Sequence, residues 1–378
     1  MPKNAVLKKW SEHFSGAPAV FASAPGRVNL IGEHTDYNQG FVFPAAINRR
    51  TQGVFRLANS NRLISAQAGA ATEIADLAKM PARGWGRFVT ACACAIRDAI
   101  GSLPPPLEGF LDSTIPSGSG LSSSAAMEAC IISAWNQLCD LKLSATQIAE
   151  IAWTAETKYV GVSCGKMDQL ASCCGKRDHG LFIDTLTLEI TPFPIPTDLS
   201  LAVLDTGKPR SLAASAYNER VAECGRAAAA LGLKSLRDAT TDQLESAKKN
   251  GLDETAYRRA RHVITENARV LQFCDALKES NLNKLGELCR ASHESLRNDY
   301  NVSSKELDAM ARAAWLAPGC VAARLTGAGF GGCCVALIRR GSFKNFENSV
   351  RASYGMYGYP EPRFFEVRAD SGAFAESV

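Results

Sequence analysis

A glycine- and serine-rich segment in the middle of the chain restricts the folds that this sequence can adopt. It runs from Ile115 to Ala126, after a strand predicted over Phe110 to Ile115 and before a helix predicted from about Ser124 to Cys139. Glycines let the backbone approach an anion closely, and the start of a helix offers unpaired N–H groups. The segment therefore predicts a phosphate cradle, although an N-capped helix after a flexible turn explains it equally well in isolation.

Two common nucleotide-binding classes do not fit this sequence. The cradle lacks the Gly-Lys-Ser/Thr of a P-loop. A second glycine cluster, Thr326 to Gly332, contains a formal G-x-G-x-x-G, but the apolar run Cys333 to Ile338 that follows is typical of a buried strand. A dinucleotide-binding fingerprint needs a helix there. We therefore expect a strand, a close-packed glycine loop and a second strand, with a plain glycine-rich hairpin as the alternative.

Charged residues gather in a loop near the N-terminus. Between two apolar strands, Ala24 to Gly40 holds a cation, two carboxylates and a histidine, namely Arg27, Glu33, His34 and Asp36. Carboxylates accept hydroxyl protons, so this mixture suits recognition of a sugar. A solvated loop with an internal ion pair is the alternative.

Two further carboxylates are candidates. Asp168 lies where a helix over 168–174 is predicted to begin, and a helix N-terminus favours a negative charge. An ionised Asp168 could accept the proton of an attacking hydroxyl. Glu156 lies beside the apolar face of a helix that Ser144 and Gln147 begin with a capping box, so it is either half-exposed or turned toward a cation. For Asp168 the alternative is an ordinary helix cap.

The length of 378 residues favours two domains, which we place at 1–198 and 199–378. Strands are predicted at Val20–Ser23, Phe41–Ile47 and Thr51–Leu57, and a helix at 84–101. A strand at Leu201–Leu204 precedes a largely helical stretch to about residue 316, and strands return at Val321–Leu325 and Cys333–Ile338.

The composition of the chain gives no indication of binding to nucleic acids, membranes or zinc. The net charge of +4, without a basic run, gives no indication of nucleic-acid binding, and no apolar run is long enough for a membrane helix. The start of the chain does not resemble a signal peptide. The 13 cysteines include no C-x-x-C pair, so we expect reduced thiols rather than a zinc site, in a cytoplasmic protein.

Several segments together resemble the galactokinase family of the GHMP kinase superfamily. The three kinase motifs are matched by Gly26–Tyr37, Gly118–Ala125 and Leu325–Gly332. The resemblance continues in Cys164–Gln169, Arg258–Asn267 and Ser292–Tyr300, in family order. It implies an α+β fold of two lobes, with mixed or antiparallel sheets, packed helices and the active site between the lobes.

The resemblance also implies roles for single residues. Asp168 and Arg27 would be the catalytic pair that transfers a phosphoryl group from ATP to the 1-hydroxyl of galactose. Ser124 and Glu156 would hold Mg²⁺. The sugar would contact Glu33, His34, Asp36, Gly165 and Tyr217, and the ATP phosphates would lie against Gly118, Ser119, Gly120, Leu121, Ser122, Ser123 and Ser124.

Some alternatives stay open at this point. Lys166 stands where the family usually carries an apolar residue, and Phe43, Ala45 and Leu204–Gly207 also depart from the common pattern. A related kinase for N-acetylgalactosamine, arabinose or another monosaccharide is therefore one alternative, and a non-catalytic galactose sensor is another. As partners we expect a small-molecule sugar and MgATP, and a monomer or weak homo-oligomer.

Overall fold

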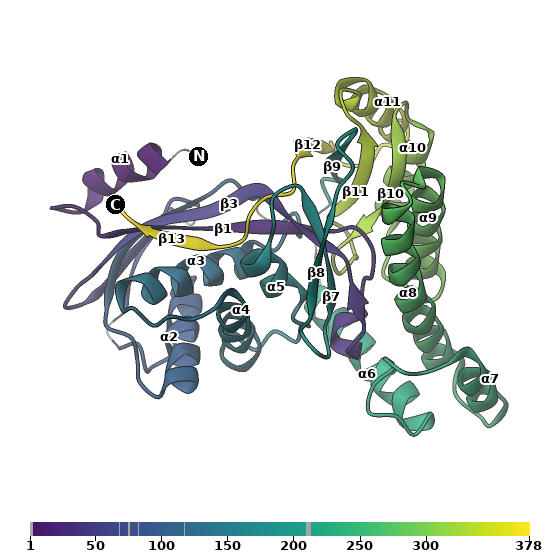
Figure 1. Cartoon of the computed structure of the whole chain (residues 1–378), viewed down its shortest axis with the longest axis horizontal. Helices are drawn as coiled ribbons and strands as arrows, with labels where there is room; N and C mark the ends of the chain where they lie inside the picture. The colour runs from purple at the N-terminus through teal and green to yellow at the C-terminus, as the bar shows by residue number, and fades with distance from the viewer. Residues whose placement is uncertain (1–2, 68, 75, 82, 117, 209–212) are drawn as a thin grey trace.

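The computed structural model describes residues 3–378, apart from 68, 75, 82, 117 and 209–212. The chain forms two lobes that lie end to end along the long axis of the molecule (Figure 1). Both lobes combine antiparallel or mixed sheets with packed helices, which confirms the expected α+β class. In the described part of the chain, no helix has the length and apolar character needed to span a bilayer.

The N-terminal lobe is built on a six-stranded sheet in the order β13-β1-β3-β6-β4-β5, in which only the β4–β6 pair is parallel. Helices α2 to α5 lie on one face and α1 on the other (Figure 1). The strands are β1 Val20–Asn29, β3 Pro44–Leu57, β4 Asn61–Ser65, β5 Ala70–Ile74, β6 Leu107–Ser113 and β13 Phe374–Ser377. The helices are α1 Lys3–His13, α2 Gly86–Ile100, α3 Ser123–Leu138, α4 Ala145–Thr154 and α5 Met167–Cys174.

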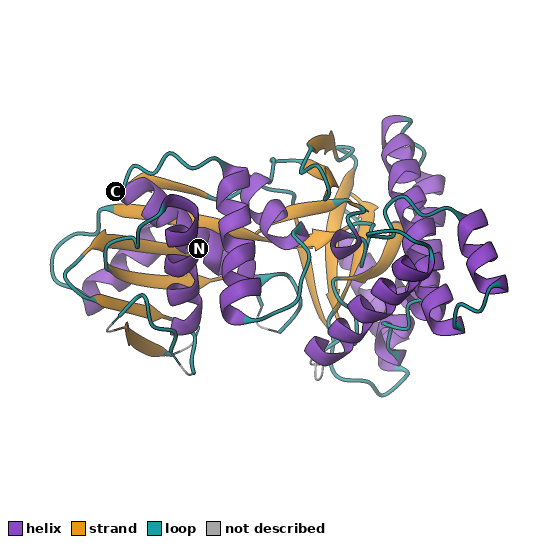
Figure 2. Cartoon of the chain, turned by 90° about the horizontal axis from the view of Figure 1, so that it is seen from below, coloured by secondary structure: helices purple, strands orange, loops and turns teal. Residues whose placement is uncertain are grey.

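The C-terminal lobe has a four-stranded antiparallel sheet in the order β10-β11-β9-β12, against which α9 and α10 pack. A small sheet of β2, β7 and β8 lies between the lobes (Figure 1). Helices gather at the end of the molecule remote from the two termini (Figure 2). The strands are β2 Phe41–Val42, β7 His179–Asp184, β8 Ile190–Pro194, β9 Leu199–Asp205, β10 Cys320–Thr326, β11 Cys333–Arg339 and β12 Arg363–Val367. The helices are α6 Ala213–Ala230, α7 Thr241–Lys249, α8 Glu254–Lys278, α9 Leu282–Asn298, α10 Lys305–Leu316 and α11 Phe343–Gly355.

Most predicted elements are confirmed, and two predictions need correction. The strand predicted over Phe41–Ile47 is divided, because β2 pairs with β7 whereas β3 runs on without a break from Pro44 to Leu57. The helix begun by the Ser144 capping box is α-helical only to Thr154 and continues as a π-helical turn, Ala155–Val160. Pro192 and Pro194 lie in β8, an edge strand, where a missing N–H costs no ladder bond.

The division of the chain at residue 198 remains a prediction, but one strand from the second part of the chain belongs to the sheet of the first lobe. β13, at the C-terminal end of the chain, pairs with β1 in the N-terminal sheet, with Val20 opposite Ser377. The chain therefore returns to its first lobe after completing the second.

All 13 cysteines are free thiols.

Candidate active site

Arg27 and Asp168 form an ion pair at the inner end of the N-terminal sheet. Arg27 follows a register shift in β1 and is 4% exposed. Its Nε donates to Asp168 Oδ1 over 2.7 Å, and its Nη1 donates to the carbonyl oxygen of Gly120 over 2.8 Å. One guanidinium group therefore joins β1 to the glycine–serine loop and to the start of α5.

The second oxygen of Asp168 also has a partner. Ser122 donates its hydroxyl to Asp168 Oδ2 over 2.5 Å, from a left-handed backbone conformation with φ of 59°. Asp168 is the second residue of α5, and 31% of its side chain is exposed. The carboxylate is thus fixed on two sides and open on a third, as a proton acceptor must be.

The glycine–serine loop is divided between inward and outward residues. Ser119 and Leu121 are buried, and the Ser119 hydroxyl donates to the carbonyl of Pro116 over 2.7 Å. Gly118 and Gly120 have φ of 71° and 78°, and α3 begins at Ser123. The hydroxyls of Ser119 and Ser122 are therefore already engaged, whereas the glycine backbone and the first residues of α3 remain as groups that an anion could contact.

Glu156 projects from the π-helical turn and is only 8% exposed. It accepts hydrogen bonds from Ser124 and from Gln169 Nε2, the latter over 2.5 Å. Burial and the nearby charge of Asp168 raise the pKa of Glu156 to about 7, although the bond from Ser124 lowers it. A buried carboxylate beside a serine hydroxyl, with its charge poorly compensated, is a set of hard oxygen donors that suits a divalent cation.

A cavity of about 290 Å³ opens beside Asp168. It is lined by residues from four segments that are far apart in the sequence, including Arg27, Glu33, His34, Asp36, Glu156, Gly165, Asp168, Tyr217, Gly327 and Ala328. The structure thus brings together the residues for which the sequence predicted catalysis and sugar contact, with Glu156 beside them. The residues of the glycine–serine loop do not line this cavity within the described chain, but Ser123 and Ser124 line a neighbouring one of about 340 Å³.

Asp36 lies close against the backbone of Gly165. A Cβ atom at residue 165 would lie 2.0 Å from Asp36 Oδ2, so only glycine allows this approach. Burial, followed by the charge of Asp168, raises the pKa of Asp36 to about 7. The cavity therefore holds several carboxyl groups whose charges oppose one another.

His34 lines the cavity with both ring nitrogens engaged. Its Nε2 is 3.1 Å from the carbonyl oxygen of Ala328, which can only accept, so Nε2 carries the proton. Nδ1 then accepts from the hydroxyl of Tyr37 over 3.0 Å. Burial lowers the pKa of His34 to about 3, so the ring is neutral and offers a ligand its surface rather than a free nitrogen.

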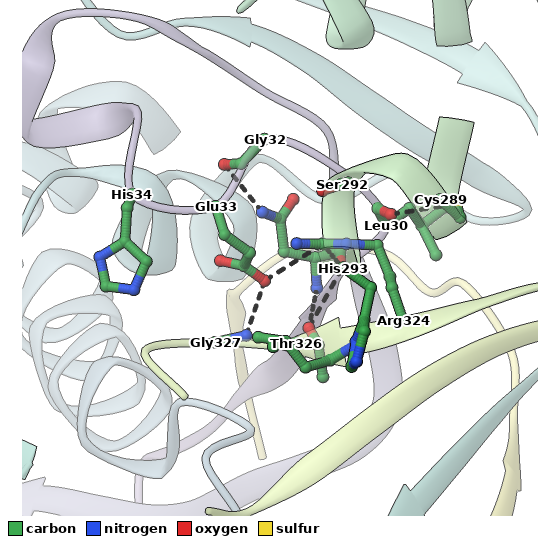
Figure 3. A network of polar contacts seen from close by, with 12 residues as sticks. Leu30, Gly32, Glu33, His34, Cys289, Ser292, His293, Arg324, Thr326 and Gly327 are labelled. Atoms are coloured by element: carbon green, nitrogen blue, oxygen red, sulfur yellow. Dashed lines mark hydrogen bonds and ion pairs between the residues drawn. The ribbon is translucent and has the colours of Figure 1, made fainter. Parts of the chain in front are cut away.

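The sequence analysis missed a buried network behind Glu33. Arg324 is 0% exposed, and its Nη1 lies 3.4 Å from Glu33 Oε1 and 3.2 Å from the carbonyl oxygen of Asn29 (Figure 3). Glu33 Oε1 also accepts the N–H of Gly327 over 2.6 Å. Glu266 accepts from Gly32 N and from Ser292, over 3.0 and 2.5 Å. Glu266 and Ser292 lie in the two segments Arg258–Asn267 and Ser292–Tyr300 that resemble the family, but the sequence of these segments does not indicate this role.

The surroundings of Glu128 and Lys166 could not be predicted from the sequence. Glu128 on α3 is fully buried beside Gln169, and burial raises its pKa well above the ordinary value. Lys166, which departs from the family pattern, turns away from the cavity: its Nζ lies 3.2 Å from Glu150 and 4.9 Å from the centre of the Trp153 ring.

Comparison with known proteins identifies related sequences over most of the chain. A model described as the galactokinase galactose-binding signature matches residues 8–57. Models for the N-terminal and C-terminal domains of GHMP kinases match residues 87–176 and 274–355. The galactokinases of Roseiflexus sp. (strain RS-1) and Haemophilus influenzae are 40% and 37% identical to this chain, covering 92% and 94% of it and 90% and 94% of their own lengths.

Among solved structures, the fold of this chain is similar to that of a galactokinase and to that of another kinase. The galactokinase of Lactococcus lactis in complex with galactose superposes with a TM-score of 0.93 at 33% identity, over 98% of each chain. The mevalonate kinase of Methanococcus jannaschii shares the fold, with a TM-score of 0.65 at 18% identity over 94% of this chain and 99% of its own.

The raised pKa of Asp36 predicts a specific dependence of stability on pH. A carboxyl group whose pKa is higher in the folded state stabilises the fold below its ordinary pKa, and that contribution is lost as pH rises through about 7. Asp36→Asn removes this loss. We therefore expect its stability, relative to the parent, to increase by at least about 1 kcal/mol between pH 5 and pH 8.

Urea unfolding at the two pH values measures this change. The control is Asp140→Asn, which removes an equal charge from a side chain that is 82% exposed and should show no such trend. A pH trend that is the same in both variants would disprove the assignment to Asp36.

Proposed function

This chain belongs to the galactokinase family of the GHMP kinases and is an ATP-dependent sugar kinase. We propose that it phosphorylates the 1-hydroxyl of galactose and that Asp168 accepts the proton of that hydroxyl. One observation carries the proposal. The carboxylate that Arg27 and Ser122 hold faces the same cavity as Glu33 and Asp36. A proton acceptor and a set of hydroxyl-binding groups therefore share one small space.

In the proposed reaction, Asp168 accepts the proton of the sugar 1-hydroxyl. The sugar oxygen forms a bond to the γ-phosphorus of ATP as the bond between that phosphorus and the bridging oxygen of ADP breaks. Arg27 contacts both Asp168 and Gly120 O, so its charge lies between the proton acceptor and the loop proposed to carry the phosphates. Such catalysis depends on positioning and on fixed charge more than on covalent chemistry.

The nucleotide is proposed to lie along the N-terminus of α3. Gly118, Gly120 and the first amides of α3 would bind the phosphates. The neighbouring cavity, lined by Ser124, Trp85, Phe88 and Met127, is suited to the base. Within the described residues, the buried Nε1 of Trp85 has no hydrogen-bond partner, which supports a polar ligand there.

Ser124 and Glu156 are proposed to hold Mg²⁺. The donor set fits, because a hydroxyl and a buried carboxylate of raised pKa lie in contact beside the phosphate loop. When bound, the ion would neutralise charge on the β- and γ-phosphates. The chain's own contribution is to keep both oxygens in place, through the bond from Gln169 to Glu156.

All of these groups come from one chain, which supports the proposal that the protein works as a monomer or weak homo-oligomer. Thirteen free thiols favour a reducing compartment such as the cytoplasm.

The assignment of Glu156 predicts the behaviour of Glu156→Gln. We expect at least a hundredfold loss of turnover and a higher Mg²⁺ requirement, because an amide is a poorer ligand for a hard cation. We also expect greater stability above pH 7, since a buried carboxyl group of raised pKa is gone.

Initial rates across a Mg²⁺ titration, with thermal unfolding at pH 8, measure both effects. The matched control is Glu150→Gln, on the same helical segment but paired with Lys166 on the surface. Parental activity of Glu156→Gln at saturating Mg²⁺ would remove Glu156 from the metal site.

Selectivity for the sugar is proposed to depend on Asp36 and Tyr217. Galactose and glucose differ in the direction of the 4-hydroxyl, and a site that binds one direction leaves buried polar groups unpaired with the other. We expect kcat/KM for glucose to be at least about a hundredfold lower than for galactose. Tyr217→Phe should make this difference between the two sugars smaller.

A panel of free sugars with MgATP, followed by ADP release, tests this prediction and the alternative sugars. Tyr257→Phe is the control, because Tyr257 lies on α8 outside the cavity lining and its hydroxyl donates to Glu245 on α7. Equal kcat/KM for the two sugars in the parent would favour a broad hexose kinase.

Asp168→Asn separates catalysis from binding. The variant keeps the shape of the side chain but loses its basicity, which typically costs about 10²–10⁴ in rate. We expect binding of MgATP and galactose within roughly tenfold of the parent, or about 1.4 kcal/mol. Turnover should fall at least a hundredfold.

Calorimetry and initial-rate kinetics on the same sample provide the comparison. Near-parental turnover with intact binding would exclude Asp168 as the proton acceptor. If the parent binds galactose but transfers no phosphate under any MgATP condition, the chain is a sensor instead.

A further inference from the structure

Arg237 contacts the loop that carries Asp36 from the opposite lobe. It lies between α6 and α7, and its side chain is 14% exposed. Its two terminal nitrogens donate to the two carboxylate oxygens of Asp184, each over 2.7 Å. Nη1 also donates to the carbonyl oxygen of Gln39 over 2.8 Å, and the guanidinium carbon lies 4.1 Å from the centre of the Phe41 ring.

Several contacts hold the loop from Asp36 to Phe41 through its main-chain atoms. Thr185, next to Asp184, donates its hydroxyl to the carbonyl oxygens of Gly40 and Asp36, over 2.8 and 3.1 Å. The N–H of Phe41 donates to Asn267 Oδ1 on α8 over 3.0 Å. Arg237 adds the bond at Gln39, where the backbone has the left-handed φ of 59°. Displacement of this loop would therefore move Asp36.

The same arginine is linked to the other proposed sugar-binding group. Tyr217 lies on α6, the helix before Arg237. The Tyr217 ring packs on the first part of the loop, with centroids 5.1 Å from Tyr37 and 5.5 Å from His34. Arg237 thus joins the chain segment that carries Tyr217 to the loop that carries Asp36.

We propose that Arg237 is a positioning residue for sugar selectivity, which sets the separation of Asp36 and Tyr217 by clamping the Asp36 loop to the segment after α6. The proposal rests on the roles proposed above for Asp36 and Tyr217. It needs arginine rather than any cation, because a planar group with paired donors fixes both the distance and the angle of a carboxylate. Asp184 is itself held in place, since its Oδ1 accepts the N–H of Leu186 over 2.9 Å.

Arg237→Lys tests the proposal, because lysine keeps the charge but cannot make the paired bonds. We expect KM for galactose to rise about tenfold and the ratio of kcat/KM for galactose over glucose to fall about tenfold, since displacements of about 1 Å at a site are costly. KM for ATP should stay within about twofold, because the clamp does not contact the phosphate loop.

The chain offers a closely matched control in Arg56. Arg56 also contacts a carboxylate (Glu108, 2.8 Å), a main-chain carbonyl (Ser15, 2.6 Å) and an aromatic ring (Trp10, 5.2 Å), but at the end of β3 remote from the cavity. Arg56→Lys should lower the melting temperature without changing either sugar parameter. A purely structural role for Arg237 predicts the same result for Arg237→Lys.

The proposal is overturned if Arg237→Lys keeps the parental galactose KM and selectivity ratio, whatever its melting temperature. If that variant does not fold, Asp184→Asn is measured in the same way, and failure of both to fold also overturns the proposal in favour of a structural role. A parent that already fails to discriminate galactose from glucose would contradict the proposed roles of Asp36 and Tyr217 instead, so the two failures are distinguishable.

Discussion

Arg324 is a fully buried cation at the contact between the two lobes, where it joins the loop after β1 to α8. Without it, Glu33 would be left with little compensation in an interior where burial already raises its pKa. Removing one partner of such a buried set costs several kcal/mol, typically about 3–5. The network therefore stabilises one placement of Glu33 and of the glycine loop at Gly327.

The cavity is surrounded by backbone that departs from regular geometry. His34 and Ser122 adopt left-handed φ values, and Glu156 projects from a π-helical turn. A π-turn rotates the residues that follow it, and it directs Glu156 toward Ser124 instead of along the apolar face of α4. Such conformations cost free energy and persist only where packing enforces them. Their concentration around one cavity is independent physical support for locating function there.

The sequence could predict the helices and strands better than the tertiary contacts between them. The capping box at Ser144, the strand–glycine–strand unit around Gly329 and the start of α5 were readable because each depends on local chemistry. The pairing of Arg27 with Asp168, 141 positions apart, could come only from a family resemblance. The return of β13 to the first sheet, the continuity of β3 and the role of Arg324 had no local indication, since each is decided by tertiary packing. His34 was expected to contact sugar, yet its nitrogens prove to be engaged by Tyr37 and Ala328.

The electrostatics of the cavity indicate what it is organised to receive. Four carboxyl groups line it, and Asp36 and Glu156 have pKa values raised to about 7, so the protein's own cations compensate them only in part. Arg27 pairs with Asp168 and Arg324 with Glu33, whereas among the described residues no cation forms an ion pair with Asp36 or Glu156. Under the proposed assignment, a sugar would supply hydroxyl donors to Asp36, and a divalent cation would supply charge to Glu156. Keeping these two buried carboxyl groups therefore costs stability, as groups selected for function commonly do.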